Sequence, residues 1–163
     1  MMKYALPVKL LIFTLFLSGC GVYTLNPRGK SDIKNIAVEP FENKTNEFGL
    51  ADIITEIVID AFIADGSLKV VSLENSDAYL VGTLTRYERV PSKFDENDQV
   101  EEYKVLMDFE IALKNPKDDS EKWREKITQE GIYNALDETE EDGQERAGQR
   151  LVEAIINKTT KSW

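Results

Sequence analysis

Two kinds of hydrophobic period divide residues 33–163 into strands and helices. Apolar side chains occupy every second position from Tyr103 to Leu113, which predicts a strand over 100–115 with one apolar face. Over 50–66 they recur at helical spacing up to Gly66, which predicts a helix that stops there. A similar stripe over 141–163 begins with acids and ends with lysines, as suits a helix dipole. Shorter apolar runs predict four more strands: 33–41, 68–72, 77–90 and 121–134.

The predicted element order is β-α-β-β-β-β-α, which favours an α+β fold. We expect a two-layer sandwich whose mostly antiparallel or mixed sheet of four to five strands carries two helices on one face. A parallel partner for strand 33–41, reached over the first helix, fits the usual crossover rules. Residues 42–49 read as a turn, and 89–98 as a long hairpin loop. Phe94 at the tip of that loop either inserts into a partner or folds back onto the domain.

The first nineteen residues have the layout of a secretory signal peptide. Lys3 and Lys9 precede or flank a short apolar run, Leu10 to Leu17, and small residues follow it. A finished membrane-spanning helix needs roughly 20 apolar residues, so this run is too short to be one. We therefore expect residues 1–19 to be cleaved, although an uncleaved anchor and a plain signal peptide remain alternatives.

Leu17-Ser18-Gly19-Cys20 resembles the bacterial lipobox, and Cys20 is the only cysteine of the chain. The resemblance implies that the Cys20 sulfur receives a diacylglycerol, that cleavage occurs just before it, and that the new N-terminus is acylated. Several acyl chains on one residue hold a protein on a membrane, since each buried methylene contributes about 0.8 kcal/mol. Gly21, where retained lipoproteins carry Asp, implies export to the outer membrane. Residues 20–32 then form a tether, and 33–163 form a single domain.

The negative net charge of the chain argues against electrostatic binding to anionic partners. The chain has 20 Lys and Arg against 30 Asp and Glu, a net charge of −10. Removal of residues 1–19, which hold two lysines and no acid, makes this −12. Nucleic acids and anionic leaflets attract cationic proteins, so neither is an expected electrostatic partner.

No catalytic constellation is apparent. The chain has no histidine to act as a general base, and its serines lie outside any Gly-x-Ser-x-Gly elbow. It has no phosphate-binding loop or dinucleotide fingerprint, and no metal-ligand cluster is expected. We therefore predict a binding or scaffolding protein that is not an enzyme and needs no cofactor beyond the covalent lipid.

The order and spacing of several loose motifs resemble the lipopolysaccharide-assembly lipoprotein family (LptE). They are Cys20-Gly21-x-Tyr23, the stretch from Ile36 to Thr45, and Asp77 to Leu84. The resemblance covers nearly all of the mature chain and implies a sheet with two helices on one face. It also implies a lipid-anchored protein at the periplasmic face of the outer membrane, which plugs an LptD-like β-barrel translocon, helps it assemble and contacts lipopolysaccharide.

Lipopolysaccharide is anionic, so a chain of this charge needs clustered cations to contact it. Two groups are candidates, and ordinary surface charge is the alternative for both. They are Arg86, Arg89 and Lys93 in one group and Lys122, Arg124 and Lys126 in the other.

A second hypothesis is a different envelope lipoprotein. The stretch IAVEPFEN (36–43) also resembles the opening of domains in other periplasmic transport and secretion machines. Such a protein acts as an interaction module there, and a weaker idea is a small lipid bound between helices and sheet.

We expect intact-mass analysis of the membrane-extracted protein to give a chain that starts at Cys20 and carries a diacylglycerol and an N-acyl group. The apolar run and lipobox together make this the expected product. An unmodified thiol, or residues 1–19 still attached, would contradict the envelope assignment.

Overall fold

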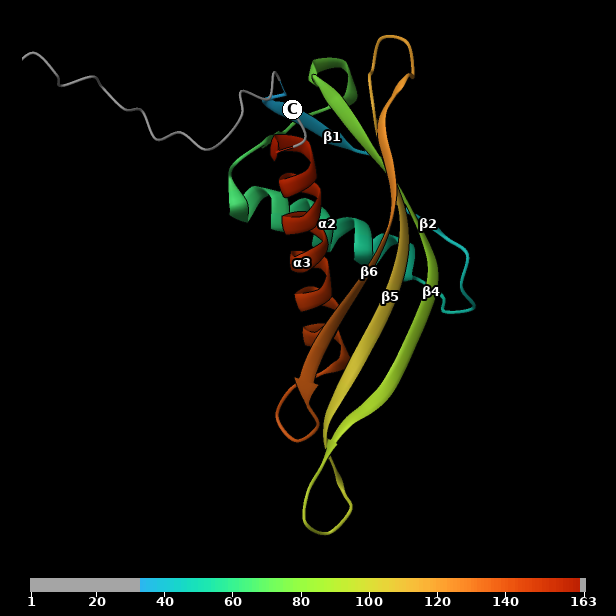
Figure 1. Cartoon of the computed structure of the whole chain (residues 1–163), viewed down its shortest axis with the longest axis vertical. Helices are drawn as coiled ribbons and strands as arrows, with labels where there is room; N and C mark the ends of the chain where they lie inside the picture. The colour runs from blue at the N-terminus through green and yellow to red at the C-terminus, as the bar shows by residue number, and fades with distance from the viewer. Residues whose placement is uncertain (1–32, 162–163) are drawn as a thin grey trace, which may run out of the picture.

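The computed structural model describes residues 33–161 (Figure 1). The predicted signal peptide, the tether with Cys20 and the last two residues lie outside this range. Its elements run in the following order: β1 (Asn35–Val38), β2 (Glu42–Asn43), α2 (Leu50–Asp65), β3 (Lys69–Val70), a 3₁₀ turn (Leu73–Asn75), β4 (Ala78–Phe94), β5 (Val100–Lys114), β6 (Glu121–Asn134) and α3 (Glu140–Lys161).

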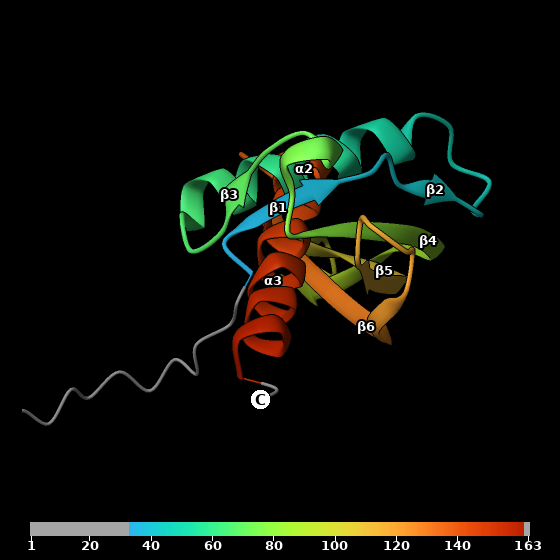
Figure 2. The same ribbon diagram turned by 90° about the horizontal axis from the view of Figure 1, so that it is seen from above.

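The elements form one mixed sheet with both helices on the same side of it (Figures 1 and 2). The strand order is β3-β1-β4-β5-β6, with β2 paired to β4. β1 runs parallel to β3 and β4, whereas β4, β5 and β6 are antiparallel. This confirms the predicted α+β sandwich and the parallel partner reached over the first helix.

The sheet has six strands because β2 forms after a break at Pro40, within residues 42–49 that were predicted as a turn, and the predicted strand 33–41 is shortened to β1. Pro40 lacks an N–H, so the ladder cannot continue through it. At the break the Phe41 N–H donates to Thr55 Oγ1 of α2 at 2.9 Å, and the Phe41 ring turns into the core. There it meets Phe109 edge-on at 6.2 Å between ring centroids. Gly82 makes room for that ring, since a Cβ at this position would lie 2.1 Å from it.

The alternation along β5 is the main source of the core. Five of the six predicted apolar side chains, Val105, Met107, Phe109, Ile111 and Leu113, are at most 1 % exposed. The stripe of α2 and that of α3 lie against them in one continuous cluster. The hydrophobic periods of these three elements therefore dictate both layers of the fold.

The predicted loop over 89–98 is wrong for most of its length. β4 continues to Phe94 and pairs with β5 up to Val100, so the turn itself spans only the residues between them. Register shifts on either side of Lys93 allow the ladder between β4 and β5 to continue beyond Pro91. Asp95 then closes the turn by accepting hydrogen bonds from the N–H groups of Asn97 and Gln99, each at 2.8 Å.

Helix α3 approaches β6 and α2 closely at glycines. A Cβ on Gly131 of β6 would lie 1.8 Å from the Gly143 carbonyl oxygen of α3. A Cβ on Gly148 would lie 2.1 Å from Ile57 of α2, where the two helices cross. Within residues 33–161, no helix combines the length and the hydropathy that crossing a membrane requires.

We expect Gly131→Ala to lower the free energy of unfolding by about 3 kcal/mol, the upper end for overpacking, because a backbone carbonyl cannot rotate away. Urea denaturation measures this loss. Gly66→Ala is the control: no atom lies within 4 Å of its Cβ position, and its φ of 67° costs only about 1 kcal/mol. Equal losses in the two variants would show that the close approach of α3 and β6 is unimportant.

Candidate functional site on the outer face of the sheet

The face of β4, β5 and β6 that points away from the helices carries a network of ion pairs. Arg86 contacts Glu88 at 2.9 Å and Asp108 at 3.2 Å, Lys126 contacts Glu110 at 3.1 Å, and Lys104 contacts Glu130 at 3.1 Å. Arg124 pairs with Glu121. We call these four cations and five carboxylates the outer-face network. Its net charge is −1, against −10 for the whole chain.

The ion pairs of the outer-face network lower the pKa values of two of its carboxyl groups. The hydrogen bond from Lys126 lowers the pKa of Glu110, and that from Arg86 lowers the pKa of Glu88. Both carboxylates are thus charged at neutral pH, and the cations beside them are already neutralised.

Five of the six predicted lipopolysaccharide contacts pair with carboxylates, and one of the five, Arg89, does so on the other face of the sheet. Arg86, Arg124 and Lys126 belong to the outer-face network, and Lys93 pairs with Glu101 at 2.8 Å. Lys93 is in register with Glu102 and Arg124 with Ala112, ten residues apart on β5. At roughly 3.4 Å per residue, Lys93 and Arg124 therefore lie roughly 30 Å apart along the sheet. The structure therefore does not bring them into one positive patch.

Arg89 lies on the opposite, helix-facing side of β4. Its guanidinium stacks on the Tyr103 ring at 3.9 Å and pairs with Glu140 of α3 at 3.7 Å. The reason is the register shift between Leu84 and Arg86, where the extra residue inverts the alternation. Lys122, the sixth candidate, is exposed and forms no ion pair within the part of the chain that the structure describes.

The far end of the sheet presents two exposed apolar side chains. Phe94, the last residue of β4, is 55 % exposed, so more than half of this side chain is open to solvent. Leu136, in the turn from β6 to α3, is 88 % exposed. The Ala135 N–H donates to the Glu101 carbonyl at 3.0 Å, which places this turn beside the β4–β5 hairpin. We call Phe94 and Leu136 the apolar tip.

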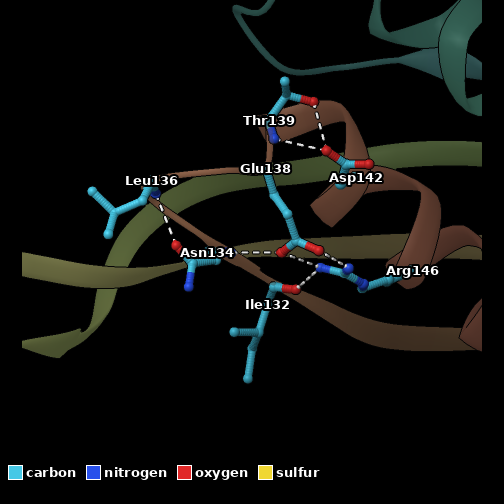
Figure 3. Close-up of polar contacts among 7 residues, drawn as sticks. All are labelled: Ile132, Asn134, Leu136, Glu138, Thr139, Asp142 and Arg146. Atoms are coloured by element: carbon cyan, nitrogen blue, oxygen red, sulfur yellow. Dashed lines mark hydrogen bonds and ion pairs between the residues drawn. The ribbon is translucent and has the colours of Figure 1, made fainter.

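A clasp of charged side chains fixes the turn that carries Leu136 (Figure 3). Glu138 pairs with Arg146 of α3, and Glu138 Oε2 accepts the Asn134 N–H at 2.7 Å. Arg146 also donates to the Ile132 carbonyl at 2.5 Å. Thr139 and Asp142 cap the start of α3 next to it, at 2.7 Å between the Thr139 nitrogen and the carboxylate. The start of α3 and the end of β6 are thereby held together.

Sequence reasoning did not find Leu136. Its surroundings, NALDETEED, hold one large apolar residue among acids, which gives no periodic signal. Phe94 was found as a single aromatic residue in a polar stretch, and the same criterion applied to Leu136 would have identified the apolar tip.

The model of the family LptE, described as lipopolysaccharide-assembly, matches residues 33–159. The chain belongs to this family. Membership gives it a role in lipopolysaccharide assembly and confirms the resemblance inferred from the motifs. No curated protein sequence matches the chain.

Several solved structures share the fold at low identity. CT253 from Chlamydia trachomatis is 8 % identical, with 77 % of this chain and 97 % of that chain covered and a TM-score of 0.55. PelC from Paraburkholderia phytofirmans, a dodecamer, is 12 % identical, with coverages of 73 % and 86 % and a TM-score of 0.52. XCC0632 from Xanthomonas campestris is 15 % identical, with coverages of 77 % and 84 % and a TM-score of 0.51. At these identities the likeness shows a common fold alone.

The clasp predicts a specific pH dependence of stability. Hydrogen bonds from Arg146 and then the Asn134 N–H lower the pKa of Glu138 from 4.5 to about 2. Because the folded pKa is the lower one, the clasp stabilises fully above pH 4.5 and loses its effect as the pH falls toward 2. We expect Glu138→Gln to lower the urea midpoint at pH 7 and to lower it much less at pH 2.

The matched control is Glu141→Gln in the first turn of α3, because the Glu141 carboxylate forms no ion pair with the described residues. We expect the urea midpoint of Glu141→Gln to equal that of the wild type at both pH 7 and pH 2. A Glu138→Gln loss of equal size at pH 7 and pH 2 would mean that the clasp does not carry this pH dependence.

Proposed function

We propose that this protein is an outer-membrane lipoprotein that plugs the lumen of the β-barrel lipopolysaccharide translocon and helps that barrel assemble. The observation that carries the proposal is the family match over residues 33–159. In this proposal lipid chains on Cys20 hold the protein at the periplasmic face, and the domain rises from there into the barrel.

The outer-face network supports the plugging role. The interior of a membrane β-barrel is polar, in contrast to its lipid-facing exterior. A plug therefore needs a surface that is polar without a large charge of one sign, since like charges that meet across a contact are costly. The outer face meets this requirement with four cations and five carboxylates, although the chain as a whole is strongly acidic.

The apolar tip supports a contact at one end of the plug. Large exposed apolar side chains in well-packed pockets dominate the energy of protein interfaces. Phe94 and Leu136 are exposed on backbone that is tied down by the Asp95 turn and by the clasp. Because ordered backbone loses little entropy on binding, these two residues suit a pocket in the barrel wall.

Contact with lipopolysaccharide is the third part of the proposal. Phosphate and carboxylate are both good partners for guanidinium and ammonium groups. A phosphate can therefore replace a carboxylate at an exposed pair such as Lys126–Glu110, where the lysine side chain is 84 % exposed. The proposed contacts remain the six candidate cations: Arg86, Arg89, Lys93, Lys122, Arg124 and Lys126.

The decisive experiment is affinity purification of the full chain from outer membranes in mild detergent. We expect a large β-barrel protein to co-purify. Phe94→Asp combined with Leu136→Asp should reduce its recovery about tenfold, the effect of losing a central apolar contact. Both side chains are exposed, so the fold should be retained.

Phe48→Asp is the matched control, because Phe48 is fully exposed in the loop before α2 and lies outside the apolar tip. It should leave recovery of the barrel unchanged. If no barrel co-purifies with the unaltered chain, the plugging role is wrong. If Phe48→Asp reduces recovery as much as the double variant, the apolar tip is not the contact.

A further inference from the structure

A groove of about 790 Å³ lies between α2 and α3 and belongs to neither the outer-face network nor the apolar tip. Its apolar lining comes from both helices: Ile53, Ile57, Ala61, Ala64 and Val152. The two alanines leave space on the α2 side, and Ile53 is 37 % exposed. The groove is thus an apolar surface that the domain itself leaves partly uncovered.

Seven carboxylates border this apolar lining, and no lysine or arginine does. Three come from α2 and four from α3. Local roles account for some of them: Asp142 caps α3, Asp65 accepts the Ser67 N–H at 3.0 Å, and Glu145 accepts from Gln149 at 3.1 Å. The remaining four, Glu56, Asp60, Glu141 and Glu153, form no side-chain hydrogen bond or ion pair with the residues described.

The ion pairs of the described domain all lie away from the groove carboxylates. Every ion pair within residues 33–161 involves a carboxylate outside the groove. Most of these pairs lie on the sheet. The groove therefore holds like charges close together with no compensating partner, an arrangement that opposes folding of the isolated domain.

The helix dipole accounts for Glu141 and Asp142, which lie in the first turn of α3, but not for Asp65. Asp65 stands in the last turn of α2, where no basic residue is present. The macrodipole makes the C-terminal end of a helix partly negative, so cations are favoured there and carboxylates are not. The macrodipole thus disfavours Asp65 at this end of α2, where its carboxylate accepts the Ser67 N–H, and a cation bound beside the carboxylate would offset that repulsion.

We propose that the groove binds a cationic amphipathic segment of a partner protein. The apolar side chains of that segment cover Ile53 and its apolar neighbours, and its lysines or arginines pair with the bordering carboxylates. Lipopolysaccharide is excluded as an occupant because it carries the same sign of charge as the groove. The proposal is independent of barrel plugging: it concerns the helix layer, and either can fail without the other.

A synthetic peptide tests the chemistry directly. The probe is a 14-residue helix-forming peptide of leucine and lysine, with the leucines on one face, and the comparison peptide has the same composition in scrambled order. Binding to the mature protein in mild detergent is measured by fluorescence anisotropy. Asp60→Asn with Glu145→Gln should weaken binding of the amphipathic peptide about tenfold, as expected when close charge pairs are removed from an interface.

The control for total charge is Glu96→Gln with Asp98→Asn in the β4–β5 turn, which removes one glutamate and one aspartate that do not line the groove. Asp98 has a φ of 59°, a conformation that asparagine tolerates well. This pair should change the affinity less than twofold. Equal weakening by the two double variants, or equal binding of the scrambled peptide, would overturn the proposal, because attraction to the net charge alone would then explain the result.

Cross-linking in cells tests whether a partner uses the groove. A photoreactive residue at Ile53 should cross-link to a segment that is rich in lysine or arginine and in apolar residues, and Asp60→Asn with Glu145→Gln should suppress that product. The same photoreactive residue at Phe48 should not give it. No product, or a product with lipopolysaccharide, with residues 20–32 of this chain, with a second copy, or with an acidic or neutral segment, would overturn the proposal.

Discussion

The burial of one face of β5 is the constraint on which the rest of the structure depends. Its side chains from Val105 to Leu113 are removed from water only because two helices lie over them. At roughly 25 cal/mol per Å² of apolar surface, burial of such a row contributes strongly to the stability of the domain. The glycines at positions 131 and 143 allow α3 to approach close enough to complete that cover. Both layers, and the direction in which each surface faces, follow from this packing.

The same packing separates the charges of the molecule. Because the inner face of the sheet is largely apolar, most charged residues of β4, β5 and β6 lie on the outer face, where cross-strand neighbours of opposite sign meet. Arg89, which pairs with Glu140 of α3, is an exception. The helices have no such partner strand on their outer side, and their acids remain unpaired around an apolar groove. One acidic chain thus presents two chemically different surfaces: a balanced one on the sheet and a negative one on the helix layer.

Local periodicity was sufficient to predict most of the fold. The period of β5, the stripe of α2 with its stop at Gly66 and the charge order of α3 depend on neighbours along the chain, and all three were correct. The site was harder because its geometry depends on pairing between strands. The extra residue near Leu84 places Arg89 on the helix side and Arg86 on the other, and the ladder through Pro91 turns a predicted loop into strand. Neither bulge has a sequence pattern that fixes it in advance. The acidic groove was not foreseen either, since it exists only where two helices distant in sequence cross.

Strand β6 ends the sheet, and its free backbone carbonyls would ordinarily offer a template to any other extended chain. Two arginines of α3 already occupy part of this border: Arg146 donates to the carbonyl of Ile132, and Arg150 donates to that of Glu130 at 2.7 Å. These two hydrogen bonds therefore protect the domain against edge-to-edge pairing with a second copy through this strand. Helix α3 guards against aggregation in this way and also covers the core.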